Sequence, residues 1–110
     1  MEIKDLEIFN DMPFLFWVKD EAGKYLWGNQ TITQLAGEDI VGKTDRELPW
    51  AKNADALQAD DRKVFETGEP SYVHEYVEKS SQGKATLNVC KWLGEFEGNK
   101  RCFGVSFIIQ

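Results

Sequence analysis

The sequence predicts a single α+β domain, and three observations support that fold class. Its 110 residues are close to the commonest size of one domain. The composition, 42% hydrophobic and 29% charged, disfavours disordered, collagen-like and coiled-coil chains. The expected order of elements is a helix, two strands, helices and three strands, without an internal repeat or a linker.

The first elements are a short helix and a β-hairpin. Apolar residues recur every three positions at Ile3, Leu6 and Phe9, which predicts an amphipathic helix that ends near Met12-Pro13. A continuous apolar run over residues 14–18 and a second strand over 24–27 flank an Asp/Gly loop. Two such runs around a short polar loop are typical of a hairpin.

The middle of the chain is predicted to be helical. Asn29 is placed to cap a short helix that Gly37 closes. Asp45 is expected to be the N-cap of a short turn that ends at Leu48-Pro49. A longer helix over residues 52–67 ends at Gly68-Glu69-Pro70, since glycine suits a helix C-cap and proline prevents continuation.

The last third is predicted to be β again. Three alternating runs cover residues 72–79, 86–93 and 101–109. A two-residue turn at Gly98-Asn99 would place Cys90 opposite Phe107 rather than Cys102, which disfavours a disulfide between the two cysteines.

Charge and the chain ends restrict the function classes. The sequence has 13 Lys+Arg and 19 Asp+Glu, a net charge of −6, so nucleic-acid binding by this domain is not expected. The N-terminus lacks a signal-peptide pattern and no run is long enough for a membrane span, which favours a cytoplasmic domain without membrane contact. Because the sequence stops within an apolar strand, we expect a domain excised from a longer multidomain protein.

Several segments carry a family resemblance. They are residues 18–29, 40–45 and 64–70, followed by a closing hairpin from Gly98 to Val105. Their order and spacing resemble the PAS domain family, especially the sensory-box members of bacterial signalling proteins. The family's Lys-x-Pro appears here as Lys91-Trp92-Leu93, without the proline, and its closing Asp-Ile-Thr is missing.

The resemblance implies a five-stranded antiparallel sheet with the central helices on one face. The space between them holds a ligand, a cofactor or only side chains in such domains. The opposite face meets an N-terminal helix or a second copy of the domain. The family acts as a sensor or an assembly module, so this segment is not expected to be an enzyme.

Candidate pocket residues follow when the strand faces are set by similarity to the flavin-binding relatives. Polar groups that face an enclosed space need partners, and a small ligand is one such partner. The candidates are Trp17, Leu26, Gly28, Trp50, Leu57, His74, Tyr76, Asn88, Cys90 and Ser106. The alternative is a core that side chains or water fill, with His74 as an ordinary strand histidine.

The opposite sheet face is predicted to be strongly apolar. Such a face is rarely exposed on a soluble monomer, so the N-terminal helix and a partner should cover it in a homodimer. The candidate dimer residues are Ile3, Leu6, Phe9, Phe14, Phe16, Phe103 and Phe107.

Several kinds of chemistry are disfavoured. Residues 44–49 lack the cysteine that flavin-adduct photosensors of this family use, and the helix over 52–67 lacks the histidine that its haem-binding members use. No Cys/His set has metal-ligand spacing. The pair Asp60-Asp61 is interpreted as a solvated helix face rather than an acid/base dyad.

The leading functional hypothesis is a sensory module. It would perceive a small ligand or cellular cue and control a C-terminal output domain: a histidine kinase, a diguanylate cyclase or a transcription regulator. The alternative is a dimerisation or protein-interaction module that has no physiological ligand.

Overall fold

Five strands form one antiparallel sheet in the order β2-β1-β5-β4-β3. The computed structural model describes residues 1–77 and 85–108, and the side chains of residues 1–75 and 86–108. The strands are β1 (Leu15–Lys19), β2 (Tyr25–Gly28), β3 (Ser71–Val77), β4 (Ala85–Phe96) and β5 (Asn99–Ile108). The α+β class and the five-stranded antiparallel sheet that the resemblance implies are confirmed.

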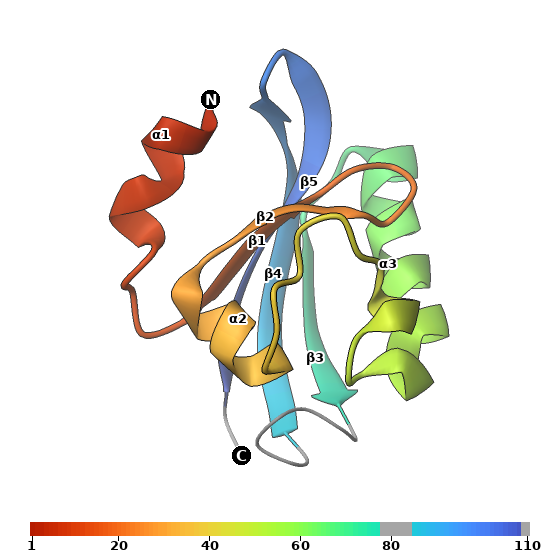
Figure 1. The fold of residues 1–110 in the computed structure, drawn as a ribbon. Coiled ribbons are helices and arrows are strands. Elements are labelled where there is room, and N and C mark those ends of the chain that lie inside the picture. Colours follow the sequence, from red (N-terminus) through yellow and green to blue (C-terminus); the bar gives the residue numbers. More distant parts are fainter. Residues whose placement is uncertain (78–84, 109–110) are drawn as a thin grey trace.

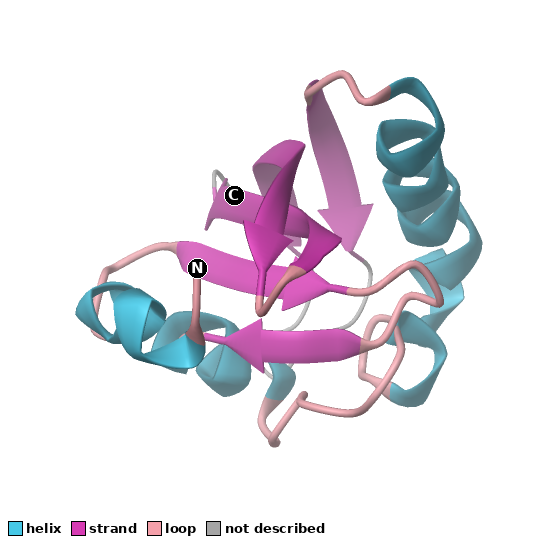
Figure 2. Ribbon diagram, turned by 90° about the horizontal axis from the view of Figure 1, so that it is seen from above, coloured by secondary structure: helices cyan, strands magenta, loops and turns pink. Residues whose placement is uncertain are grey.

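Helices lie on both faces of the sheet. The elements are α1 (Ile3–Leu6), η1 (Glu7–Phe9), α2 (Gln30–Ala36), η2 (Asp45–Glu47), η3 (Ala51–Asn53) and α3 (Ala54–Thr67). Figure 1 shows α1 and α3 on opposite sides of the strands. Figure 2, seen from above, shows the strands between these two helical layers. Among the described residues, no helix has the length and apolar character needed to cross a membrane.

The predicted signals at the ends of α2 and α3 are confirmed. The Asn29 side chain accepts a hydrogen bond from the backbone N–H of Ile32, as an N-cap does. Gly37 and Gly68 follow α2 and α3 with φ of 74° and 71°, the left-handed conformation that glycine adopts at little cost.

The turn between β4 and β5 differs from the prediction by one residue. Phe96 pairs with Asn99, so the two turn residues are Glu97 and Gly98, with φ of 52° and 84°. Cys90 therefore pairs with Val105, not with Phe107. Both cysteines are free thiols.

Two hydrophobic clusters lie on the two faces of the sheet. The first joins the sheet to α2 and α3 and includes Leu15, Trp17, Ile32, Leu57, Leu87 and Val89. The second lies beneath α1 and includes Leu6, Phe16, Val18, Phe96 and Phe103.

The predicted assignment of the β3 and β4 side chains to the two sheet faces is wrong by one residue. Leu87 and Val89 are buried in the first cluster, and Val73 packs against it. Side chains alternate along a strand, so Tyr72, His74, Asn88, Cys90 and Trp92 are on the opposite face. Their exposure agrees, since Tyr72, His74 and Asn88 are exposed and Trp92 packs in the second cluster. The inner polar positions belong instead to Glu75 and Lys91, which pair with each other.

Candidate functional site

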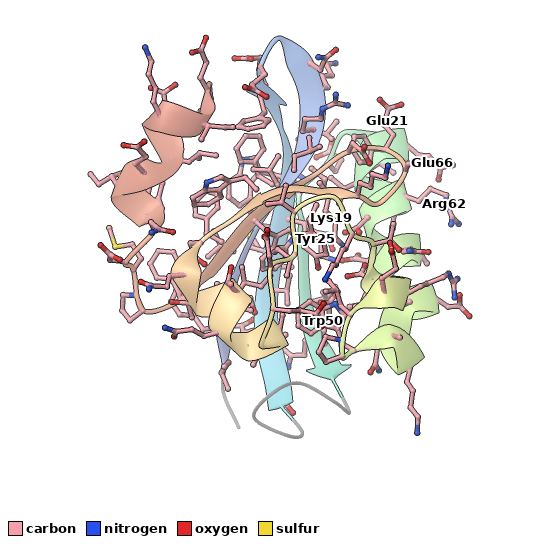
Figure 3. All side chains as sticks on the ribbon, in the orientation of Figure 1. Lys19, Glu21, Tyr25, Trp50, Arg62 and Glu66 are labelled. Atoms are coloured by element: carbon pink, nitrogen blue, oxygen red, sulfur yellow. The ribbon has the colours of Figure 1, made fainter. Side chains whose placement is uncertain are left out.

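A buried lysine forms the centre of the inner face. Lys19 ends β1 after four apolar residues, and its side chain is only 2% exposed. Its Nζ donates to Asp45 Oδ2 at 2.6 Å and to Asp61 Oδ2 at 2.7 Å. Figure 3 shows Lys19, Tyr25 and Trp50 converging between the sheet and α3. A charged group is buried in this way only when it is paired.

Asp45 connects the side chains of Tyr25 and Trp50 to this lysine. Its Oδ1 accepts from the Tyr25 hydroxyl and from Trp50 Nε1, both at 2.8 Å. The prediction that Asp45 caps a turn is wrong, because Thr44 is the N-cap of η2 and Asp45 is its first residue. The capping box between Thr44 and Glu47 fixes that turn and leaves the Asp45 carboxylate free to point inward.

A second buried lysine extends the network toward β3. Lys91 Nζ lies 2.9 Å from Asp61 Oδ1, 2.9 Å from Glu75 Oε2 and 3.1 Å from Asp60 Oδ2. The interpretation of Asp60-Asp61 as a solvated face is therefore wrong: Asp61 is buried, and Asp60 also accepts from the Ser71 hydroxyl at 2.8 Å. Asp61 connects the two lysines, because each of its oxygens lies beside a different ammonium group.

The pKa directions show how strongly these charges are coupled. Burial alone would lower the pKa of Lys19 and of Lys91, but the adjacent carboxylates, Asp61 first, raise both. Burial would raise the pKa of Asp61, yet Lys19 and Lys91 hold it below its ordinary value. Burial does raise the pKa of Glu75, despite the contact with Lys91. Of the two carboxylates, Glu75 is therefore less well compensated by nearby positive charge than Asp61.

A small cavity lies beside the network. It has a volume of about 30 Å³. Its lining residues are Leu15, Trp17, Lys19, Tyr25, Ile32, Leu35, Trp50, Leu57, Glu75, Leu87 and Lys91. Trp17 Nε1 and Ser106 Oγ are buried and have no hydrogen-bond partner within the described part of the chain. The cavity is thus lined mostly by apolar side chains, with charged groups and Trp17 among its lining residues.

The structure brings some of the predicted pocket residues together. Trp17, Trp50 and Leu57 line the cavity. Ser106 is fully buried and pairs with Leu15, a lining residue, across β1 and β5. Gly28 packs beneath the helical layer, where an added Cβ would lie 2.4 Å from Ile40 Cδ1.

Other predicted pocket residues lie elsewhere. Leu26 packs in the second cluster, beneath α1. Asn88 is exposed and Cys90 half-buried on the strand face that turns away from the cavity. His74 lines a surface groove between β3 and α3. The Tyr76 side chain lies outside the described residues.

Sequence reasoning missed the polar and charged residues that surround Lys19 in the site: Tyr25, Asp45, Asp61, Glu75 and Lys91. One signal was present. Lys19 and Lys91 each follow apolar strand residues at a position that faces inward, and an inward ammonium group needs carboxylates nearby. The acidic residues that supply them lie 26 and 42 positions from Lys19, too far for local patterns to reveal.

The predicted dimer residues divide into two groups. Leu6, Phe16 and Phe103 are buried within the chain, and Phe9 stacks on Phe16 with ring centroids 4.8 Å apart. Ile3 and Phe107 are 46% and 51% exposed. The first group thus packs in the chain's own second cluster, as does the half-buried Phe14, and Ile3 and Phe107 are the exposed members of the predicted set.

Within the described residues, no cluster of three or more His, Cys, Asp and Glu side chains is arranged to hold a metal ion. Burial, assisted by Asp61, raises the pKa of the Cys102 thiol to about 12. Such a thiol is almost wholly protonated at neutral pH and is a poor nucleophile.

Solved structures share this fold. VqmA bound to DPO matches with a TM-score of 0.83 at 23% identity, over 97% of this chain and 57% of that one. A Vibrio cholerae VqmA dimer, described without its target DNA, gives 0.84 at 23% identity, over 100% of this chain and 52% of that one. The PAS domain of the Cronobacter turicensis quorum-sensing receptor RpfR, in complex with BDSF, gives 0.71 at 12% identity, over 91% and 97%.

The chain thus spans little more than half of the VqmA chains that it matches. Among curated proteins, none matches the sequence. The family model of the PAS fold matches residues 9–92, which covers most of the chain and includes β1, β2, α2, α3, β3 and most of β4. The chain belongs to the PAS-fold family.

Proposed function

We propose that this chain is a cytoplasmic sensory module that binds a small molecule between its sheet and its helices. The observation that carries the proposal is a cavity lined by Trp17, a residue whose buried indole donor is unpaired among the described residues. Trp17 is 4% exposed, lines the cavity, and its Nε1 lacks a hydrogen-bond partner among the described residues. An unpaired buried donor costs about 1–3 kcal/mol, and a ligand with an acceptor atom would recover it.

The structural neighbours support this proposal by analogy. VqmA binds DPO and the RpfR PAS domain binds BDSF, and both share the fold of this chain. Binding would shift the populations of two arrangements of the sheet or of α1 and so act on an output domain. A kinase, a cyclase and a transcription regulator are the proposed classes of output, and the domain itself has no proposed catalytic role.

The test is a fragment screen that uses the Trp17 indole N–H as a reporter. Its NMR resonance is assigned with Trp17→Phe, and neutral, cationic and anionic fragments are added to the wild-type chain. We expect at least one fragment to shift this resonance downfield. The Trp50 indole N–H should not show this downfield shift, since Asp45 already accepts its hydrogen bond. If no fragment shifts the Trp17 resonance, the sensory proposal is wrong.

A second candidate function is dimerisation without a ligand. The exposed apolar residues of the second sheet face favour it, since Tyr72 is 76% and Phe107 51% exposed. The centroids of the Phe107 and Phe14 rings are 5.3 Å apart, which extends the apolar surface from β5 to the residue that precedes β1. A fragment screen without any response, together with a stable homodimer, would favour this candidate over the sensory one.

A further inference from the structure

Two hollows of this molecule share one wall. The interior cavity lies next to a surface groove of about 360 Å³, which is lined by Asn53, Ala56, Leu57, Asp60, Val73, His74 and Glu75. Leu57 and Glu75 line both hollows. Leu57 comes from α3, and Glu75 comes from β3, the edge strand of the sheet. Among the described residues, only these two side chains therefore belong to both the interior lining and the lining of the groove.

Size indicates how the two hollows could work together. The interior cavity of about 30 Å³ holds roughly one or two water molecules. Small-molecule sites usually measure about 300–1,000 Å³, a range that the groove already reaches. Because Leu57 and Glu75 line both hollows, their movement is the proposed way for the apolar part of a ligand in the groove to enter an enlarged cavity.

The charge at this wall is unbalanced. Lys91 faces three carboxylates, Asp60, Asp61 and Glu75, and Asp61 is shared with Lys19. With Asp45, the network holds four carboxylates and two ammonium groups. Besides Asp60 and Glu75, His74 is the remaining titratable residue among the described residues that line the groove. Buried carboxylates without matching positive charge favour a cation.

The inner end of the site has the opposite requirement. Trp17 Nε1 is a donor only, and it is buried without a partner among the residues that the structure describes. The lining of the same cavity includes the apolar side chains of Leu15, Leu57 and Leu87. This second observation is independent of the acidic residues and calls for an acceptor atom on the ligand.

We propose that the site binds a small molecule with a protonated amine at one end, a hydrogen-bond acceptor at the other and a short apolar stem between them. The amine lies in the groove between Asp60 and Glu75, the stem passes Leu57, and the acceptor meets Trp17 Nε1. This assignment of ligand class rests on the proposed sensory function.

Four five-carbon probes separate the two requirements. They are 5-aminopentan-1-ol, pentane-1,5-diol, 5-hydroxypentanoate and pentylamine, each titrated into the wild-type chain while the Trp17 indole N–H is followed by NMR. We expect the amino alcohol to bind at least tenfold more tightly than the diol, and 5-hydroxypentanoate to bind more weakly still. Pentylamine should bind more weakly than the amino alcohol and produce no downfield shift of the indole resonance.

Two variants assign each preference to a residue. Glu75→Gln keeps the size of the side chain and removes its charge, so the advantage of the amine over the diol should disappear. Glu66→Gln is the matched control, because Glu66 is an exposed residue of α3 that lines neither hollow and is labelled in Figure 3. Trp17→Phe should abolish the advantage of the amino alcohol over pentylamine, read from backbone amides of β1. If Glu75→Gln does not fold, Asp60→Asn tests the same charge.

The outcomes distinguish this inference from the proposed function. Equal or tighter binding of the diol or of 5-hydroxypentanoate overturns the charge assignment and leaves the sensory function standing. The same holds if none of the four probes binds while other fragments shift the Trp17 resonance. If no fragment of any class shifts it, the ligand class and the sensory function are both wrong.

Discussion

Lys19 shows how one residue depends on the whole chain. Its ammonium group is held by carboxylates from η2 and α3, and its Nζ lies 4.7 Å from the centre of the Tyr25 ring. A buried ion pair is not always a source of stability, because removing two charges from water is costly. Breaking such a pair is costly in every case, since the charge that remains has lost its partner.

The first prediction therefore concerns Lys19→Met, which keeps an unbranched side chain and removes the charge. Asp45 and Asp61 then lose their shared cation, so the free energy of unfolding should fall by about 3–5 kcal/mol. Urea denaturation measures the change. Lys24→Met, at an exposed position of the same hairpin, should alter stability by less than about 0.5 kcal/mol. Equal effects of the two variants would contradict the importance of the network.

The second prediction concerns Gly104→Ala. A Cβ at this position would lie 2.2 Å from Trp17 Cε2, because the indole packs directly over the glycine. Overpacking of this kind costs about 1–3 kcal/mol, measurable by thermal or urea unfolding. In a double-mutant cycle, adding Trp17→Leu should recover part of the loss. Strict additivity of the two changes would show that the two residues do not interact.

At the scale of elements, Asn29 connects three segments. Its Oδ1 accepts from Phe16 N at 3.1 Å and from Ile32 N at 3.2 Å. Its Nδ2 donates to the carbonyls of Phe9 and Phe14 at 3.0 and 2.8 Å. One buried amide thus fixes the start of α2, the start of β1 and the end of η1 relative to one another.

The third prediction is that Asn29→Ala costs about 2–3 kcal/mol of unfolding free energy. The change removes a helix cap and leaves buried backbone groups without partners. Asn99→Ala, at an exposed position in β5, is the matched control and should be nearly neutral. A similarly small loss for Asn29→Ala would mean that water replaces the amide without cost.

The fourth prediction concerns the contact between β3 and β4. Burial raises the pKa of Glu75, so the folded chain binds this proton more tightly than the unfolded chain does. Stability from this group is fully present below the unfolded pKa of about 4.3 and declines as pH rises through the folded pKa. Lys91, Asp60 and Lys19 act on this carboxylate. The pKa of Asp61 is lowered, so its contribution to stability is lost as the pH falls through its folded pKa.

Glu75→Gln should therefore remove this decline. Urea unfolding at several pH values from about 4 upward would measure the difference in stability between the variant and the wild type, which should grow in favour of the variant as pH rises. The Glu66→Gln control should retain the slope of the wild type. A constant difference across this range would contradict the raised pKa.

The elements were largely predictable from the sequence, but the site was not. Local signals such as Asn29, Gly37 and Gly68 depend on neighbouring residues, and the structure bears them out. The faces of β3 and β4 depend on register, and a shift of one residue exchanges the two faces. Asp45 and Asp61 have polar surroundings in sequence and are buried only because Lys19 and Lys91 lie opposite them in space.

At the scale of the whole molecule, α1 leaves part of the second sheet face open. The open part includes Tyr72 and Phe107, which are 76% and 51% exposed. We propose a homodimer through this part, with Ile3 at its margin. The buried residues Leu6, Phe16 and Phe103 then support the interface from below rather than contact the partner.

The fifth prediction follows from this placement. Phe107→Ser should weaken the homodimer at least tenfold, with little loss of fold stability, because half of the ring is already exposed. Sedimentation velocity over a range of concentrations measures the association. Val41→Ser, at an exposed apolar position outside the sheet, should leave it unchanged. A wild-type chain that stays monomeric at high micromolar concentration would rule the interface out.

The alternation of β4 places the inside and the outside of the molecule one residue apart. Lys91 belongs to the buried charge network, and its neighbours Cys90 and Trp92 are on the other face of the sheet. A rotation of the strand that moves the ammonium group must also tilt these two side chains. A displacement of Lys91 by the proposed ligand would therefore reach the opposite face of the sheet across one peptide bond of β4. No chain of intermediate residues would be needed.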